Sequence, residues 1–344
     1  MKKIWLHTVR FYLRCALYFY YKKVKVINAK NIPKNKPLLL LSNHQNALID
    51  ALLIAVYGNG RFFYFLTRAS VFNKPLIAKI LKSLQMIPVY RVRDGWSTIS
   101  NNVEVFNTCS ELLHNNDAVS LFPEGNHSLK RTVRPLSKGF TRIVFETLEK
   151  YPETDLQIIP LGLNYENAKN YPDSVSLNFG ITISAKQFLF EDKHKSVLKL
   201  KTVLQERISQ LTTHIPEDNY AVTLEKLKTI NVDFLQPERI NSLIKDDCLD
   251  EIPPFKSKKS TLKKLFKTLL IFQLIVPFIV WQFLIKPKIK EAEFTATFRF
   301  AVAITLVPIW VFLVFCLLAA GFSIRIGLIY LITVFLIALL TSKI

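Results

Sequence analysis

The residue types best suited to chemistry in this 344-residue sequence are a histidine and an aspartate, His44 and Asp50. A neutral imidazole can take the proton from an attacking hydroxyl near pH 7. A carboxylate hydrogen-bonded to the same ring holds its tautomer and stabilises the imidazolium that forms. We therefore predict that His44 is a general base and that Asp50 orients it.

The spacing of these two residues restricts the local structure. On an ideal helix, at about 100° per residue, positions six apart lie on different faces. The two side chains can meet only if the chain turns after His44 and a helix begins close to Asp50. Residues 37–42 form an apolar run typical of a buried strand. We therefore predict a strand, a loop that carries His44, and a helix over residues 50–57.

A second polar group follows another predicted strand, at residues 118–122. The sequence Phe-Pro-Glu-Gly ends there at Gly125, a residue that permits close approach of the backbone. Its acid can hydrogen-bond a polyol hydroxyl, and the basic residues downstream suit a phosphate. No acid follows His127 as Asp50 follows His44, so we assign this histidine to binding and not to base catalysis. The candidate binding residues here are Glu124, Gly125, His127, Arg131, Arg134 and Lys138.

Strand-like and helical patterns alternate along the first two thirds of the chain. A short strand and turn are predicted from residue 24 onward. The pattern predicts an α/β fold with its chemistry at strand ends and on the loops that follow them. Further strands are predicted at residues 61–66, 86–91, 157–164 and 174–183, and further helices at residues 74–83, 96–113 and 138–148.

The motifs, taken in order, resemble those of the glycerolipid acyltransferase family, which includes glycerol-3-phosphate and lysophosphatidic acid acyltransferases. The resemblance covers residues 24–165 and implies an acyltransferase domain, over residues 24–195, with a mixed or mostly parallel central sheet flanked by helices. It implies a catalytic His44 and Asp50, an acceptor site that includes Arg91, and a site shaped in part by residues 159–160. The motifs are Asn43-His44 with Asp50, Ile87-Pro-Val-Tyr-Arg91, Phe122-Pro-Glu-Gly125, Leu136-Ser-Lys-Gly-Phe-Thr-Arg142 and Ile159-Pro-Leu-Gly162.

Two features depart from the family pattern. The family motif has four residues between its histidine and aspartate, whereas this chain has five, residues 45–49. The family usually continues Phe-Pro-Glu-Gly with Thr-Arg, whereas this chain has Asn126 and His127. The expected phosphate-binding arginine is therefore absent, and His127, Arg131 or Arg134 would have to replace it.

Composition indicates an anionic partner. Half of the residues are apolar, and the formal net charge is +20. Such a charge suits an anionic membrane surface, a phosphorylated substrate or nucleic acid. No nucleic-acid recognition motif accompanies it, so we expect membrane lipids and not nucleic acid. The cysteines and histidines lack metal-ligand spacing, and we expect neither a metal nor a cofactor.

Apolar sequence is concentrated at the two ends of the chain. Residues 1–23 predict an amphipathic interfacial helix, with a packing helix of the catalytic domain as the alternative. Residues 196–255 predict a helical extension, and residues 256–344 a basic linker with a C-terminal helical membrane module. Within this module, residues 268–285 are expected to lie in the interface or to re-enter, and residues 300–320 and 326–340 to form a transmembrane hairpin. Such a hairpin occurs in only part of the family.

These features predict a membrane-bound O-acyltransferase of phospholipid synthesis. The expected donor is an acyl thioester, as acyl-CoA or on acyl carrier protein, and the expected acceptor is 1-acylglycerol 3-phosphate (lysophosphatidic acid). Glycerol 3-phosphate is the alternative acceptor, and a non-catalytic lipid-binding or scaffolding protein is the alternative from another class. Basic residues flank the predicted hairpin, which places the catalytic domain on the cytoplasmic face of a bacterial inner membrane.

Overall fold

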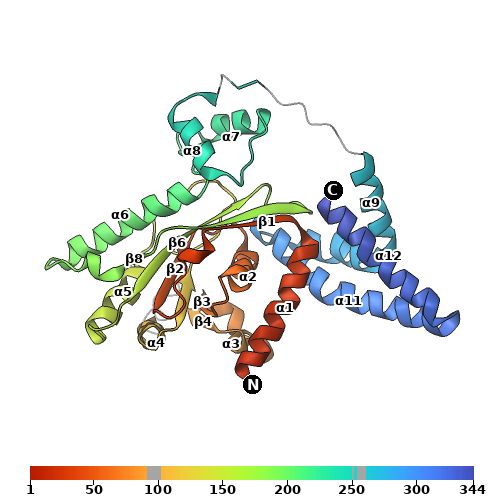
Figure 1. The fold of residues 1–344 in the computed structure, drawn as a ribbon, viewed down its shortest axis with the longest axis horizontal. Helices are drawn as coiled ribbons and strands as arrows, with labels where there is room; N and C mark the ends of the chain where they lie inside the picture. Colours follow the sequence, from red (N-terminus) through yellow and green to blue (C-terminus); the bar gives the residue numbers. More distant parts are fainter. Residues whose placement is uncertain (91–101, 250–251, 254–260) are drawn as a thin grey trace.

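The centre of the molecule is a sheet of eight strands. The computed structural model describes residues 1–90, 102–249, 252–253 and 261–344. The strand order is β1-β7-β6-β2-β5-β3-β4, with β8 paired to β6 (Figure 1). The β6–β7 and β6–β8 pairs are antiparallel and the other pairs are parallel. This sheet confirms the predicted fold class. The strands are β1 (Tyr21–Ile27), β2 (Leu38–Ser42), β3 (Phe63–Arg68), β4 (Met86–Val89), β5 (Ala118–Leu121), β6 (Gln157–Tyr165), β7 (Asp173–Phe179) and β8 (Ile183–Ser184).

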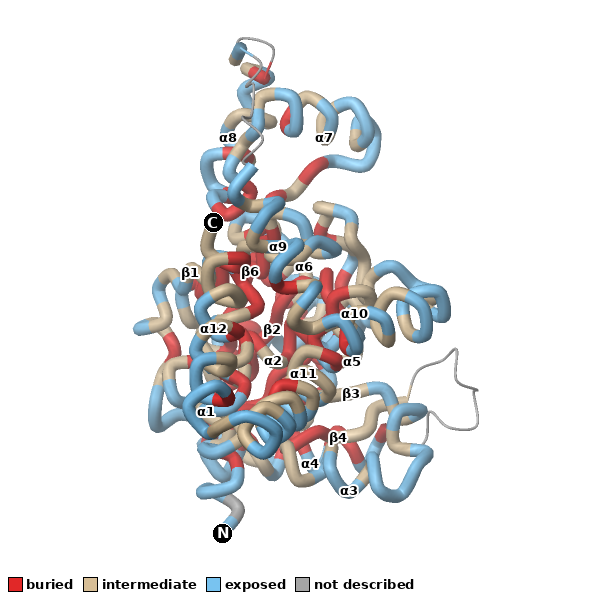
Figure 2. The backbone as a smooth tube through the Cα atoms, turned by 90° about the vertical axis from the view of Figure 1, so that its right-hand side faces the viewer, coloured by how far each residue is buried: buried red, intermediate tan, exposed pale blue. Residues whose placement is uncertain are grey.

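Helices cover both faces of the sheet, and strand β2 shows how they are held. Successive side chains of a strand point to opposite faces. Leu38 and Leu40 pack towards α1 and α2, whereas Leu39 and Leu41 pack towards α4, α5 and α6. All four leucines are fully buried, as expected for a strand covered on both sides. Figure 2 shows this buried backbone around β2 and β6. The covering helices are α1 (Lys2–Tyr20), α2 (Ala47–Tyr57), α4 (Asn102–His114), α5 (Gly139–Lys150) and α6 (Lys193–Leu211).

Several predicted elements have different ends in the structure. The helix expected at residues 50–57 begins three positions earlier, at Ala47. The strand expected at residues 174–183 is two strands, because β7 ends at Phe179 and β8 pairs with the opposite end of β6. The expected helix at 74–83 is α3 (Pro75–Ser83), with proline in its first turn. The predictions at 86–91 and 96–113 extend into residues 91–101, which lie outside the described residues.

The helical extension after α6 has a small core of its own. It contains α7 (Tyr220–Thr229) and α8 (Pro237–Lys245), which pack around Ile215, Leu227 and Ile240. It is joined to the sheet domain by contacts such as that of the Ser176 hydroxyl, which donates to the carbonyl of Leu235 at 3.2 Å.

The C-terminal module consists of a bent helical pair followed by a helical hairpin. The axis of α9 (Thr261–Gln273) and that of the helix beginning with α10 (Ile275–Ile279) meet at 100°. The hairpin helices, α11 (Thr295–Gly321) and α12 (Ile324–Lys343), are each long and apolar enough to cross a membrane. The connection between the two helices, residues 322–323, is shorter than the expected 321–325. Helix α12 begins early because the Ser323 hydroxyl caps it by accepting from the Ile326 N–H.

Helix α1 lies between the sheet domain and the hairpin (Figure 1). Leu13, Leu17 and Tyr20 of α1 are part of the domain core. On the other side, the Tyr20 ring meets Phe300 of α11 edge-on at 5.1 Å, and the Tyr12 hydroxyl donates to a carbonyl of the same helix. The packing role is therefore present in the structure. Apolar side chains such as Ile4, Phe11 and Tyr18 remain exposed, and interfacial binding stays a prediction.

Candidate active site

Two loops and the end of strand β6 meet at one edge of the sheet. Strands β2 and β5 are parallel neighbours, so the loops that follow them lie at the same edge of the sheet. The Ser128 N–H from the loop after β5 donates to the His44 carbonyl at 2.9 Å. The Asn43 side chain exchanges two hydrogen bonds, at 2.9 and 2.8 Å, with the backbone of Leu163 in β6. These bonds fix the position of His44 relative to β5 and β6.

The structure brings His44 and Asp50 together. His44 Nδ1 lies 2.8 Å from Asp50 Oδ2. The same oxygen accepts from the backbone N–H groups of Gln45 and Asn46, at 2.9 and 2.8 Å, and the Tyr165 hydroxyl donates to Oδ1. The Asp50 side chain is completely buried, whereas 15% of the His44 side chain is exposed. A buried carboxylate needs such partners, and here they also direct it at the imidazole.

The longer spacing between the two residues is accommodated at the start of α2. Ala47 has a φ of 31°, a value that L-residues rarely adopt, and α2 begins at this residue. Asp50 therefore lies in the first turn of the helix, where the helix dipole favours a carboxylate. Its side chain reaches back to the loop before the helix, as the sequence required.

The imidazole of His44 is oriented by aromatic rings as well as by Asp50. It stacks on the ring of Phe122, with centroids 3.9 Å apart and planes 9° apart. The ring of His127 meets it edge-on at 5.7 Å. Because Asp50 occupies Nδ1, Nε2 is the nitrogen that can take a proton from a substrate.

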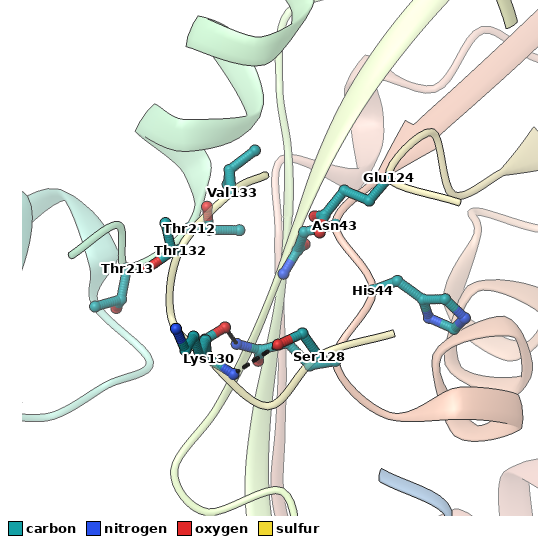
Figure 3. Close-up of a pocket in the computed structure, with 10 residues that line it drawn as sticks. Asn43, His44, Glu124, Ser128, Lys130, Thr132, Val133, Thr212 and Thr213 are labelled. Atoms are coloured by element: carbon teal, nitrogen blue, oxygen red, sulfur yellow. Dashed lines mark hydrogen bonds between the residues drawn. The ribbon is translucent and has the colours of Figure 1, made fainter. Parts of the chain in front are cut away.

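Glu124 connects the loops of the site. Its carboxylate is 3% exposed and accepts from Arg134 Nε at 2.6 Å and from the backbone N–H of His44. Burial raises the pKa of Glu124, and Arg134 opposes this shift. In the polar pocket of Figure 3, the Glu124 carboxylate lies beside Asn43, whereas the His44 imidazole points away from the pocket. Glu124 therefore binds protein groups in this structure, and its contact with an acceptor hydroxyl stays a prediction.

Gly125 follows Glu124 in a tight turn. Its φ is 78°, in the left-handed region that favours glycine, and its N–H donates to the Phe122 carbonyl at 3.2 Å. The need for glycine here is conformational.

The two arginines expected to replace the missing phosphate ligand bind protein atoms instead. Arg134 donates to the side chain and carbonyl of Asn126 as well as to Glu124. Arg131 donates to the carbonyls of Tyr165 and Glu166, both at 2.8 Å, and its guanidinium lies 3.6 Å from the centroid of Phe234. Burial lowers the pKa of Arg131 to about 10. Both guanidiniums thus donate to protein acceptors in this structure, and phosphate binding by either stays a prediction.

The other predicted binding residues have different positions. Lys138 is exposed at the start of α5, and Arg91 lies outside the described residues. His127 is beside His44, and its Nε2 lies 2.8 Å from Glu291 Oε2. The ring of His127 contacts the ring of His44 directly.

Sequence reasoning missed the contacts made by Tyr165, Glu291 and Phe294. Tyr165 is a polar-tipped side chain at the end of a buried strand, and this was the only signal of its role. Glu291 is 164 positions from His127, and Phe294, which meets the His127 ring edge-on at 4.8 Å, is equally remote. No sequence pattern connects residues so far apart.

A buried carboxylate that orients a partly exposed imidazole, at the carboxyl ends of a mostly parallel sheet, defines a site that can activate a hydroxyl. Residues 23–164 match the family model described as Acyltransferase. This match shows an acyltransferase domain over that part of the chain, and it supports the resemblance seen in the motifs.

Curated relatives share only part of this chain. It is 31% identical over 80 residues to an uncharacterized acyltransferase of Schizosaccharomyces pombe, and 26% identical over 90 residues to glycerol-3-phosphate O-acyltransferase 1 of Saccharomyces cerevisiae. These segments cover 23% and 26% of this chain and 12% of each relative. A crystal structure of the 1-acyl-sn-glycerophosphate (LPA) acyltransferase from Thermotoga maritima has 18% sequence identity and a TM-score of 0.45, over 63% of this chain and 83% of that one.

Proposed function

We propose that this protein is a membrane-bound O-acyltransferase that transfers a fatty acyl group from a thioester to 1-acylglycerol 3-phosphate. The observation that carries the proposal is the 2.8 Å contact between His44 Nδ1 and Asp50 Oδ2 within a domain of the acyltransferase family. A scaffolding protein that only binds lipid does not require a buried carboxylate directed at a partly exposed imidazole. The pair therefore favours an enzyme over that alternative.

The proposed reaction is a direct acyl transfer. His44 Nε2 takes the proton of the acceptor hydroxyl as the hydroxyl oxygen attacks the thioester carbonyl carbon. Asp50 stabilises the imidazolium, and a tetrahedral intermediate forms. Its collapse breaks the carbon–sulfur bond, and the imidazolium returns the proton to the departing thiolate. An ester and a free thiol result, with no acyl group on the protein.

An apolar pocket lies on the α2 side of the sheet. It is formed by α1, α2, β3 and the start of β4, and it includes Leu13, Ala51, Phe63 and Met86. The pocket shares helix α2 with the proposed catalytic pair, since Asp50 is also on this helix. Apolar walls suit an acyl chain, because burial is worth about 0.8 kcal/mol per CH₂ group.

The C-terminal hairpin supports an acceptor that resides in the bilayer. We propose that α11 and α12 cross a bacterial inner membrane and that the catalytic domain faces the cytoplasm. In this arrangement lysophosphatidic acid reaches the site from the membrane. Glycerol 3-phosphate is the second candidate, and the named yeast relative favours it. Acyl-CoA and acyl carrier protein are the two candidate donors.

The test is transfer by the full-length protein in phospholipid vesicles. Each acceptor is combined with labelled acyl-CoA or labelled acyl carrier protein, and the products are separated by chromatography. We expect His44→Ala to lower turnover by at least about 10²–10⁴-fold. Asp50→Asn retains an oxygen acceptor for the backbone N–H groups, and we expect it to lower turnover strongly while the protein stays bound to the vesicles in a flotation assay.

The chain offers a matched control in His114. This histidine also stacks on an aromatic ring, that of Tyr151 at 4.0 Å, and lies 3.4 Å from a carboxylate, that of Glu153. It is at the far end of α4, away from the loops of the site. His114→Ala should leave turnover unchanged. If the His44 variant retained wild-type turnover, the proposed mechanism would be lost.

A further inference from the structure

The ring of His127 lies between the proposed catalytic base and the segment that leads into α11. One contact is the edge-on contact with the His44 ring at 5.7 Å. The other contacts come from the C-terminal module: Glu291 Oε2 lies 2.8 Å from His127 Nε2, and the Phe294 ring meets the imidazole at 4.8 Å. The side chain of His127 is only 17% exposed. The C-terminal module thus reaches the loop that follows β5.

The segment that carries these residues is fixed to the domain at other points. Its 3-10 turn (η9, Ala292–Phe294) packs against α2, the helix that bears Asp50. Five residues beyond Phe294, Arg299 of α11 donates to the carbonyls of Lys169 and Asn170, at 2.9 and 2.7 Å, and to the Tyr20 hydroxyl at 2.9 Å. Glu291 is therefore held beside His127 by the anchored segment that directly follows it.

The Glu291 contact determines which nitrogen of His127 is available. The carboxylate occupies Nε2 and fixes the ring plane, which leaves Nδ1 for a ligand. An imidazolium donates from both nitrogens, so His127 can donate to Glu291 and to a ligand oxygen at the same time. Arg131 and Arg134 of this loop donate to protein groups, whereas the His127 ring contacts the His44 ring.

We infer that Glu291 is a positioning residue for His127 and that the C-terminal module thereby completes the acceptor site. In the bound complex, His127 donates Nε2–H to Glu291 and Nδ1–H to an oxygen of the acceptor's phosphate. This inference rests on the proposed function and extends it, because it couples headgroup binding to the docking of the apolar hairpin. The hairpin is then part of the active site as well as a membrane anchor.

The sharpest test is a double-mutant cycle on the full-length chain in phosphatidylcholine vesicles. The variants are His127→Gln, Glu291→Gln and the double variant, and the Michaelis constants for acceptor and donor are measured separately. We expect Glu291→Gln to raise the acceptor KM about 5- to 30-fold with the donor KM unchanged. The double variant should be no worse than His127→Gln, because Glu291 acts through His127.

Glu293 provides the matched control. It lies two positions further along the same segment and, within the described part of the chain, pairs with no basic side chain. Glu293→Gln removes the same charge and should leave both Michaelis constants unchanged. If the two substitutions changed the acceptor KM equally, the effect of Glu291→Gln would come from the loss of a negative charge anywhere in this segment, and the inference would be overturned. Additive effects of His127→Gln and Glu291→Gln, or parallel changes in donor and acceptor KM, would also overturn it.

A binding measurement separates this inference from the proposed function. Labelled lysophosphatidic acid is bound to detergent-solubilised protein and displaced by unlabelled lipid. If the wild type transfers no acyl group but Glu291→Gln still weakens binding at least 5-fold, the proposed function fails and the inference stands. If transfer occurs and Glu291→Gln binds and turns over like the wild type, the inference alone fails.

Discussion

The carboxylate of Asp50 is the residue on which the geometry of the site depends. Its two oxygens form hydrogen bonds with His44 Nδ1, with the backbone N–H groups of Gln45 and Asn46, and with the Tyr165 hydroxyl. These contacts leave the carboxylate little freedom to rotate, so the imidazole is held in one orientation. The extra residue in the motif is compatible with this arrangement, because the chain turns at Ala47, where α2 begins.

At the residue scale, the hydroxyl of Tyr165 should tune the catalytic pair. Burial, followed by the nearby Asp50 charge, raises the pKa of Tyr165 well above 10, so Tyr165 stays a donor across the working pH range. Tyr165→Phe removes that donor, concentrates charge on the carboxylate and strengthens its attraction for the imidazolium. We expect turnover to fall several-fold and the acid limb of the pH–rate profile to move to higher pH.

Tyr171→Phe is the control for this substitution. Tyr171 is partly buried, and its ring lies 5.2 Å from that of Tyr20, between centroids. Its loss should leave the pH–rate profile in place. A Tyr165→Phe enzyme with reduced turnover but the wild-type profile would mean that the hydroxyl serves only folding.

The sequence predicted the contact between His44 and Asp50 but not the contacts of the basic residues. Imidazole chemistry and placement at a strand end are local properties, so the sequence around His44 was sufficient to predict this contact. The hydrogen-bond partners of Arg131 and Arg134 depend on which carbonyls and carboxylates the fold brings near them. A sequence shows that a guanidinium is present, but not whether protein groups already occupy its N–H donors.

At the element scale, the type of each element was easier to predict than its ends. Strand β2 is buried on both faces and therefore reads as a continuous apolar run. Helix α5 is buried on one face and therefore reads as a mixed apolar and polar pattern. Both patterns indicate the type of element clearly. The division between β7 and β8 was not predicted. The segment between them contains Gly180, whose N–H donates to Pro160 of β6 at 2.8 Å, and this tertiary contact has no local pattern.

Glycine is required in β6 where the strand passes the end of α6. A Cβ on Gly162 would lie 2.0 Å from the carbonyl oxygen of Leu211. The side chains of Asn164 and Asn178 donate to this same oxygen, at 3.0 and 3.3 Å. Gly162→Ala must move the end of α6, and by analogy with overpacked cores we expect a loss of about 1–3 kcal/mol in the free energy of unfolding.

Thermal unfolding in detergent measures this effect, and Gly139→Ala is its control. Gly139 is the first residue of α5, and the nearest atom to an added Cβ is 3.9 Å away. Alanine is the better helix former, so this control should be neutral or more stable by up to about 1 kcal/mol. An unchanged melting temperature for Gly162→Ala would show that α6 ends differently in solution.

At the scale of the whole molecule, both ends of the hairpin lie on the side of the catalytic domain. Arg299 near the start of α11 binds loop carbonyls of the domain, and Lys343 at the end of α12 donates to the carbonyls of Tyr18 and Tyr21 at 2.8 Å. Composition predicted the module from its apolar residues. Its contact with the site joins residues far apart in the sequence and therefore required the fold.

This arrangement predicts the topology of the hairpin. A cysteine at Ser323, in the connection between α11 and α12, should react with a membrane-impermeant maleimide only from the membrane side opposite the catalytic domain. The substitution is made after the four native cysteines have been replaced. A cysteine at Asn35, an exposed position before β2, should react only from the domain side. Labelling of both cysteines from one side would exclude a transmembrane hairpin.

The position of α1 has a consequence for biosynthesis. This helix is made before α11 and α12, yet Tyr12, Tyr20 and Phe19 find their partners on those two helices. Until α11 and α12 have been made, one side of α1 is uncovered and apolar. Lipid or a chaperone must shield that side during this interval.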